Sequence, residues 1–446
     1  MKHYTLPSKK ITVPSLNLGK NQSIHKCCGS VLPVAEASTK ILEDLTNKLI
    51  TEVWNKKATI GTEGQLIVAE ALELVGGLKK GFGVTVGYNT PDTLAYQMME
   101  YNLFEFSESK TEARLAAMTE LLLNKDKNGI VSEAEFKKLA NEKVKDLNQN
   151  YLTTEYNLSV AVGQSSADYH RAMAQKDDFP WVEYQTVGDS KVRDAHKKLD
   201  GKFLNLNDKE AMKLWPPNGY WCRCKILRSN RSNPPAHKIM TGEEAQKALI
   251  AQDDKWATSQ FNINRGDLKQ VFTKKQFYSD IKGLPEKLNE MTFDKYDLKK
   301  WDSFKSDLNP IKLDQSIIES NAKELFKPLK NENFMGFEDY FDRKLMMNEK
   351  VFDKHIKGKY LNKEEIRHQL FPHIKDVLAN PDEVWYNNPD NLDGKFQSRY
   401  IKFYKDLVLI VDCKTTGNGL EIFTWYQAKK EDLYFRKGLL VRNKVL

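Results

Sequence analysis

The sequence has no long apolar run, and neither sign of charge is in large excess. No stretch approaches the roughly 20 apolar residues that span a bilayer, and the first 20 residues carry no apolar core of a signal peptide. We therefore expect a soluble protein without a membrane anchor. Cysteine is scarce, with five residues in 446, an odd number that excludes a regular disulfide framework and favours a reducing compartment. Lys and Arg exceed Asp and Glu by 69 to 61, a net charge of +8, which is too little for a dedicated nucleic-acid coat protein.

The length and the texture of the chain indicate several domains. At about 150 residues per domain, 446 residues predict about three. Apolar residues recur at helical spacing up to about residue 175, whereas short β-branched and aromatic runs separated by turn residues follow later. The sequence thus predicts a multidomain α+β fold with an irregular arm at 1–34, a helical domain at 35–180, a small α+β domain at 181–275, a polar linker at 276–333, and at 334–446 a domain of helix followed by antiparallel sheet.

Polar residues and two cysteines recur in a specific pattern between residues 186 and 226. Four polar residues are spaced by four, three and four positions, so a helix would place them on one face. They are Asp189, Arg193, His196 and Asp200. Cys222 and Cys224 alternate as in a strand, so both thiols can face one centre and, with His196, hold a structural zinc ion. Alternatively, the cluster is a buried hydrogen-bond network and the thiols are small core side chains.

Two patterns fill this segment, T-x-x-D-x-x-V-R-x-x-H-x-x-L-D-G from Thr186 to Gly201 and P-P-N-G-x-W-C-R-C from Pro216 to Cys224. They resemble the Mu F-like minor head, or head morphogenesis, family of tailed bacteriophages, and the resemblance extends over about residues 40–275. It implies a protein of the capsid interior, present in few copies near the portal vertex, with portal and capsid proteins as partners.

Residues 124–135, NKDKNGIVSEAE, follow the template of an EF-hand calcium loop. The residues at loop positions 1, 3, 5, 6, 9 and 12 are Asn124, Asp126, Asn128, Gly129, Ser132 and Glu135. Position 1 lacks the usual aspartate, and Lys125 and Lys127 lie inside the ligand ring. A polar turn between two helices accounts for the same residues, and we favour it over calcium.

Histidines and cations gather in the C-terminal part of the chain, where His355, His368 and His373 fall within 19 residues. Metal-independent RNA cleavage needs a base for the 2′-hydroxyl proton, an acid for the leaving oxygen, and cations and hydroxyls for the phosphorane charge. This region supplies all of them, and no carboxylate cluster indicates a metal, so we expect the cleavage to need no cofactor. The alternative is that these are surface cations on an ordinary helix and sheet.

A second resemblance rests on GFEDYFDRKLMMNEKVFDKHIKGKY, RHQLFPHIKDVLANPDEVW, RYIKFYKDLVLIVDCK, EIFTWY and YFRKGLLV. These segments are similar to phage-associated barnase, EndoU, colicin and RelE-like nuclease domains, the BECR fold, over about residues 334–446. The residues carried over from this resemblance are His355, Arg367, Tyr400, Lys402, Thr424 and Arg436. In the mechanism we favour, His355 exchanges protons, Arg367 and Lys402 hold the scissile phosphate, and Tyr400 and Thr424 donate to its oxygens.

Together the two resemblances imply a phage or prophage head protein, found in the virion and in the host cytoplasm, whose C-terminal domain is a ribonuclease-like toxin or effector with RNA as substrate. The alternative is a purely structural assembly protein whose inactive C-terminal domain binds protein or packaged DNA.

Overall fold

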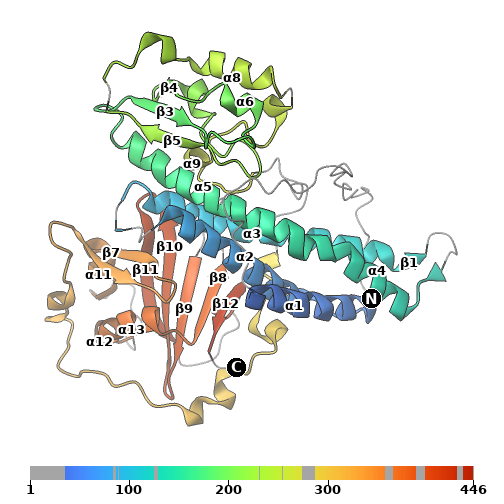
Figure 1. The fold of residues 1–446 in the computed structure, drawn as a ribbon. Helices are drawn as coiled ribbons and strands as arrows, with labels where there is room; N and C mark the ends of the chain where they lie inside the picture. Colours follow the sequence, from blue (N-terminus) through green and yellow to red (C-terminus); the bar gives the residue numbers. More distant parts are fainter. Residues whose placement is uncertain are drawn as a thin grey trace.

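A computed structural model describes residues 36–83, 87–88, 90–124, 129–230, 232–253, 255–273, 287–356, 365–387, 397–428 and 435–444. The predicted arm at 1–34, with Cys27 and Cys28, lies outside the described residues. Figure 1 shows long helices with a small lobe at one end and a large sheet against one side. This arrangement confirms the predicted multidomain α+β class. Within the described part of the chain, no helix has both the length and the apolar character that a membrane crossing requires.

The N-terminal helices form the elongated part of the molecule. They are α1 (Glu36–Trp54), α2 (Ile60–Phe82), α3 (Thr93–Leu121), α4 (Glu133–Asp146) and α5 (Leu152–Met173), with a short hairpin of β1 (Leu123–Asn124) and β2 (Gly129–Ile130) before α4. Glycines let α2 and α5 pack backbone against backbone. A Cβ on Gly81 would lie 2.1 Å from the carbonyl oxygen of Val160, and one on Gly163 would lie 2.5 Å from that of Leu78.

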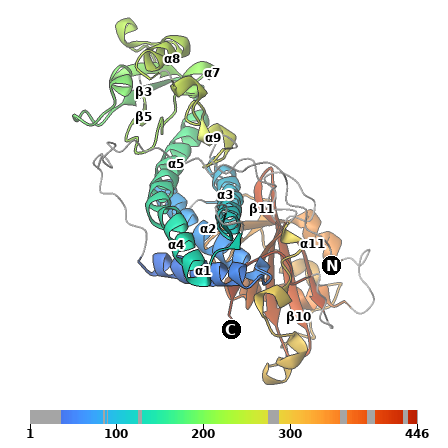
Figure 2. The same ribbon diagram turned by 90° about the vertical axis from the view of Figure 1, so that its right-hand side faces the viewer.

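The small lobe sits at the end of α5, apart from the large sheet (Figure 2). Its elements are β3 (Trp181–Gln185), α6 (Asp194–Lys197), β4 (Lys202–Asn205), α7 (Lys209–Met212), β5 (Lys225–Arg228) and α8 (Gly242–Ile250), and α9 (Arg265–Leu268) packs against α5. The three strands form an antiparallel sheet in the order β4-β3-β5. Val182, Leu204, Trp215 and Leu249 belong to a core cluster distinct from that of the rest of the chain.

The large sheet has seven strands in the order β12-β8-β9-β10-β11-β7-β6. The strands are β6 (Phe334–Glu338), β7 (Lys344–Asn348), β8 (Glu383–Asn387), β9 (Gln397–Phe403), β10 (Val408–Thr416), β11 (Gly419–Ala428) and β12 (Leu439–Asn443), with α11 (Glu349–Ile356), α12 (Arg367–Leu370) and α13 (Ile374–Ala379) between β7 and β8. Among the described strands of this sheet, β7 and β11 form the one parallel pair, through Leu345 and Met346 of β7. The chain leaves this short pairing at Asn348 and enters α11, which contacts β11 further along.

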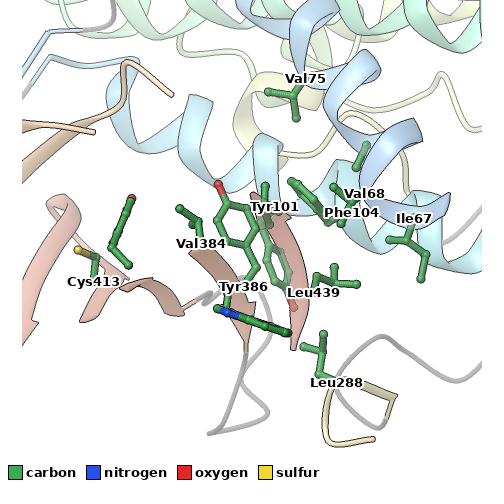
Figure 3. Packing of buried hydrophobic residues seen from close by; sticks show 14 of the residues in the cluster. Ile67, Val68, Val75, Tyr101, Phe104, Leu288, Val384, Tyr386, Cys413 and Leu439 are labelled. Atoms are coloured by element: carbon green, nitrogen blue, oxygen red, sulfur yellow. The ribbon is translucent and has the colours of Figure 1, made fainter. Parts of the chain in front are cut away.

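The large sheet and the N-terminal helices share one hydrophobic core. Figure 3 shows Ile67 of α2 and Phe104 of α3 next to Tyr386 and Leu439 of the sheet. The ring centroids of Phe104 and Tyr386 are 5.0 Å apart in an edge-to-face arrangement. The described part of the 334–446 region is therefore covered by residues from the other end of the chain.

The structure corrects the prediction of a weakly packed linker at 276–333. In its described part, from residue 287, the segment contains short 3-10 helices, and several of its large apolar residues are buried. Leu288, Phe293, Tyr296 and Trp301 all belong to the same core as the sheet. The prediction relied on average polarity, but a few large apolar side chains hold this segment while the many polar residues between them face outward.

Candidate active site and candidate metal centre

Three of the predicted C-terminal residues meet where α11, α12 and β11 come together. His355 lies in the last turn of α11, Arg367 begins α12, and Thr424 lies in the middle of β11. The His355 Nε2 atom is 3.1 Å from Thr424 Oγ1, and Arg367 Nη1 donates to the same oxygen at 3.4 Å. We call these three residues the His355 cluster.

Trp425 explains why these three segments meet. Its ring is fully buried and stacks on the His355 ring, with centroids 4.8 Å apart. Its Nε1 donates to the backbone carbonyl of Arg367 at 2.9 Å. Phe352 of α11 and Phe371 after α12 pack against the same indole. One buried tryptophan therefore orients both the histidine and the arginine beside Thr424.

The surroundings of His355 fix how its imidazole is protonated. Nδ1 is 2.7 Å from the carbonyl oxygen of Val351, which can only accept, so we assign the ring hydrogen to Nδ1. The lone pair of Nε2 then faces Thr424. Burial lowers the pKa of His355 below its usual value, and the nearby cations Arg367 and Lys354 lower it further, against the opposing effect of the Val351 carbonyl. The ring is consequently neutral at pH 7, as a general base must be.

The same face of the sheet carries further polar residues beside the His355 cluster. Thr424 is paired across the strands with Asp412 of β10, and Asp412 with Arg399 of β9. Residues paired in this way project to the same face. Arg399 donates two hydrogen bonds to Asp412, at 2.7 and 2.9 Å. Tyr426 follows Thr424 by two positions, so it shares this face. Asp412 was not among the site residues predicted from the sequence. The alternation of Thr424 and Tyr426 along β11 is the sequence signal that indicates a polar face on this part of the sheet.

Tyr400 and Lys402 do not join the His355 cluster, which corrects the predicted site. Tyr400 is fully buried, and its hydroxyl donates to Asp339 and accepts from Arg343 at 2.6 Å. Lys402 pairs with Asp376 at 2.8 Å. Tyr400 of β9 is paired with Val411 of β10, and Val411 is paired with Trp425 of β11. Paired residues project to the same face of a sheet, and Trp425 is the strand neighbour of Thr424, so Tyr400 projects to the face opposite Thr424.

Arg436 is also placed elsewhere and has a structural environment. Its guanidinium binds both carboxylate oxygens of Glu383, at 2.5 and 2.9 Å, and donates to the carbonyl of Lys299 at 2.8 Å. It lies over the rings of Phe293 and Phe403. This arginine joins the 287–333 segment to the sheet.

Of the three clustered histidines, only His355 hydrogen-bonds with Thr424 in the described part of the chain. His368 lies in α12, and His373 ends a 3-10 turn that separates α12 from α13. The helical segment is thus interrupted by a 3-10 turn at Pro372.

The two halves of the central pattern are joined by hydrogen bonds from two arginine side chains. Arg223 donates to both carboxylate oxygens of Asp189, at 2.7 and 2.8 Å, which lowers the pKa of Asp189 to about 2. Arg193 donates to the carbonyl of Tyr220 at 2.6 Å. The predicted common helix face is wrong, because α6 covers only Asp194–Lys197. Asp189 instead accepts from the backbone of Lys191, a local bond that competes with helix formation.

His196, Cys222 and Cys224 come together in this lobe. Nδ1 of His196 is 3.8 Å from Sγ of Cys222 and 3.4 Å from Sγ of Cys224, and the three donor atoms lie within 4.8 Å of one another. Both thiols are free, and they precede β5 rather than lying in it. The hydrogen bond from Cys224, followed by the contact with His196, lowers the pKa of Cys222. Among the described residues, this is the group of His, Cys and acidic side chains that could hold a metal ion.

The candidate calcium loop is only partly described. Asp126 and Asn128 lie outside the described residues. Ser132 caps α4 by accepting from the backbone N–H of Glu135, so this proposed ligand has a helix-capping role.

Family comparisons bear on both sites. Residues 113–227 match the model described as Phage Mu protein F like protein, and residues 324–441 match the model described as phage-Barnase-EndoU-ColicinE5/D-RelE like nuclease2. The chain is 34% identical over 61 residues to the Mu-like prophage FluMu F protein of Haemophilus influenzae, which is 14% of this chain and 15% of that relative. It is 29% identical over 75 residues to the Putative capsid assembly protein F of Escherichia phage Mu, 17% of either chain. No solved structure matches it. The matches confirm both resemblances, the first of them over residues 113–227 of the expected 40–275. The aligned segments span less than a fifth of each relative's length.

Proposed function

Since the chain joins a Phage Mu protein F like region to a phage nuclease-like domain, we propose that it is a head-assembly protein whose C-terminal domain cleaves RNA without a metal ion. The observation that carries the nuclease assignment is the meeting of His355, Arg367 and Thr424, which come from three separate segments. The matched nuclease model supports it independently.

In the proposed mechanism, His355 acts as the general base. Its Nε2 takes the proton from a ribose 2′-hydroxyl while the Thr424 hydroxyl turns towards the phosphate. The 2′-oxygen forms a bond to phosphorus, and the 5′-oxygen leaves with a proton from solvent. The products are a 2′,3′-cyclic phosphate and a 5′-hydroxyl, and the His355 proton returns to solvent.

Arg367 and Thr424 stabilise the developing charge. The Arg367 guanidinium is held by Glu365, and Trp425 holds the backbone carbonyl of Arg367. The guanidinium lies within hydrogen-bond reach of Thr424 and therefore beside the reacting phosphate. Preorganised donors of this kind act without reorganising during the reaction. Lys402 and Tyr400 have no part in this mechanism, because they belong to other networks.

The head-assembly part of the proposal rests on the Mu F-like region and on the name of the phage Mu relative. We expect the protein to reside in the virion and to bind the portal protein encoded by the same phage. Co-expression of the two proteins should yield a complex that co-elutes in size-exclusion chromatography. Separate elution would contradict this partner assignment.

One observation favours a second candidate function. His355 is only 8% exposed, and both of its ring nitrogens are hydrogen-bonded. A closed site of this kind fits a C-terminal domain that binds phage proteins or packaged DNA and has no activity. The presence or absence of RNA cleavage separates the two functions.

The test uses the full-length chain, because the sheet shares its core with the helices. We expect cleavage of an RNA oligonucleotide in excess EDTA, a 2′,3′-cyclic phosphate end, and resistance of the same oligonucleotide with a 2′-deoxy substitution at the cleaved position. Cleavage that requires added Mg²⁺, or no cleavage, would overturn the metal-independent mechanism.

A matched pair of threonine variants sharpens this test. Thr424→Val removes the proposed donor and should slow cleavage by a factor on the order of 10² to 10³. Thr416→Val, in the same hairpin, removes a hydroxyl that bonds its own turn at Gly419 and should leave the rate unchanged.

A further inference from the structure

We propose that His196, Cys222 and Cys224 bind a Zn²⁺ ion that ties together the two halves of the central segment. This site lies in the small lobe, whose core is separate from that of the proposed nuclease site. The inference therefore stands independently of the proposed RNA cleavage.

The spacing of the three donor atoms fits a tetrahedral ion. With Zn–S bonds of about 2.3 Å and Zn–N bonds of about 2.0 Å, a nitrogen and a sulfur ligand lie about 3.5 Å apart. The two measured separations from His196 Nδ1, 3.4 Å to Cys224 and 3.8 Å to Cys222, lie on either side of this value. A donor set of two thiolates and one imidazole is typical of zinc among the metals that proteins bind.

Two arginines lie near the cysteine pair. Arg193 lies near Cys224, and its guanidinium is fixed by the carbonyl of Tyr220. Arg223 lies between the two cysteines in the chain and is held by Asp189. The positions of both arginines are thus fixed by the same lobe that brings the cysteines to His196.

A buried oxygen beside the cluster provides a second observation. The Asn218 side chain is 4% exposed and donates to the Tyr184 hydroxyl, which in turn contacts the Cys224 sulfur. Its Oδ1 is buried and has no hydrogen-bond partner. No fourth His, Cys, Asp or Glu joins the group among the described residues. Water in the fourth zinc position would complete the tetrahedron and bring a hydrogen-bond donor to this side of the lobe.

The test is metal analysis of the full-length chain, purified under reducing conditions without a metal-affinity tag and then exposed to Zn²⁺ and desalted. We expect about one equivalent of zinc. Replacement by Co²⁺ should give the intense visible bands of a tetrahedral ion and a thiolate-to-cobalt charge-transfer band. Zinc below about a tenth of an equivalent, with Cys222 and Cys224 both reacting at once with a thiol reagent, would overturn the proposal.

Cysteine variants assign the ligands. Cys222→Ser, Cys224→Ser and His196→Ala should each reduce bound zinc at least tenfold, whereas Cys413→Ala and the double variant Cys27→Ser/Cys28→Ser should retain it. Loss of zinc in the double variant, or its retention in Cys222→Ser, would contradict the assignment. If a ligand variant fails to fold, thiol titration of the wild-type chain decides. Two thiols must become reactive only after the metal is removed with a chelator, and the same number of reactive thiols before and after chelation would refute the site.

Discussion

In the small lobe, the residues that define the sequence pattern are polar, and they join separate segments of the chain. In the large sheet, the alternating residues are apolar, and they pack into the core that the sheet shares with the N-terminal helices. Asp189 with Arg223, and His196 with the two cysteines, join positions 26 to 34 residues apart. These residues are the ones that carry the family resemblance, so the sequence singles them out. Apolar residues of the sheet carry no such mark of their partners.

The dependence of the sheet on the rest of the chain extends beyond α2 and α3. Gly61 at the start of α2 lies so close to the 287–333 segment that a Cβ there would be 1.8 Å from the carbonyl oxygen of Lys295. The Tyr296 hydroxyl donates to the carbonyl of Gly438 at 3.0 Å. The segment thus bridges the helices and the sheet, and a fragment beginning at residue 334 would expose part of their common core.

The largest expected effect concerns the location of the chemistry. Replacing His355 with Ala should lower RNA cleavage by a factor on the order of 10² to 10⁴, because the general base is lost. The matched control is His373→Ala, which removes a histidine that does not contact Thr424 in the described part of the chain. Initial cleavage rates of folded variants check this. Loss of activity in the His373→Ala control alone would show that the general base lies between α12 and α13 and is not His355.

The second prediction tests the shared core directly. Trp301 is fully buried and donates to the carbonyl of Tyr404 at 2.9 Å. Trp301→Ala should therefore lower the free energy of unfolding by about 3–5 kcal/mol. Ile318, in the same segment, is 52% exposed, and Ile318→Ala should change it by less than about 0.5 kcal/mol. Chemical denaturation followed by circular dichroism measures both changes. Equal effects of the two substitutions would show that the segment is a weakly packed linker.

Two glycines of α2 give opposite predictions for the helical part. Gly81→Ala places a Cβ 2.1 Å from a backbone oxygen of α5 and should cost about 1–3 kcal/mol. Gly76 is exposed, and a Cβ there meets nothing within 4 Å. Gly76→Ala should stabilise the helix by about 0.5–1 kcal/mol. Thermal unfolding that shifts both variants in the same direction would contradict the backbone contact between α2 and α5.

The smallest effect belongs to the small lobe. Thr241 and Glu244 form a capping box at the start of α8, so Thr241→Ala should cost about 1 kcal/mol. Thr258→Ala, at an exposed position outside α8, is the control and should cost less than about 0.5 kcal/mol. Hydrogen exchange should detect the Thr241 effect in β3–β5 and α8 while the large sheet keeps its protection. Equal loss of protection in both regions would show that their cores are coupled.

The sequence predicts much of the fold class and brings out three members of the candidate active site. Histidine, arginine and threonine chemistry, together with the family resemblance, singles out His355, Arg367 and Thr424. Nothing in the sequence separates them from Arg436, whose partner Glu383 is 53 residues away. Tyr400 was included for its hydroxyl, but strand register sends that hydroxyl to Asp339 on the opposite face.

The same limit explains the error in the central segment. Spacing by three and four residues predicts a common helix face only if the whole stretch is helical. Asp200 accepts from the backbone N–H of Thr186, and Gly188 adopts a positive φ of 71°. These local bonds and this turn confine the helix to four residues, while the convergence of His196 with the cysteines follows from long-range packing.

The measurement that tests the proposed mechanism most directly is the pH dependence of kcat/KM for RNA cleavage by the full-length chain. Burial and the neighbouring cations hold the pKa of His355 below its ordinary 6.5, so the neutral base persists below that pH. The rate should fall at acid pH with an apparent pKa below 6.5, and Arg367→Gln should move that pKa upward because a positive neighbour is lost. An acid limb centred above 6.5, or one that Arg367→Gln leaves in place, would contradict the assignment of His355 as the base.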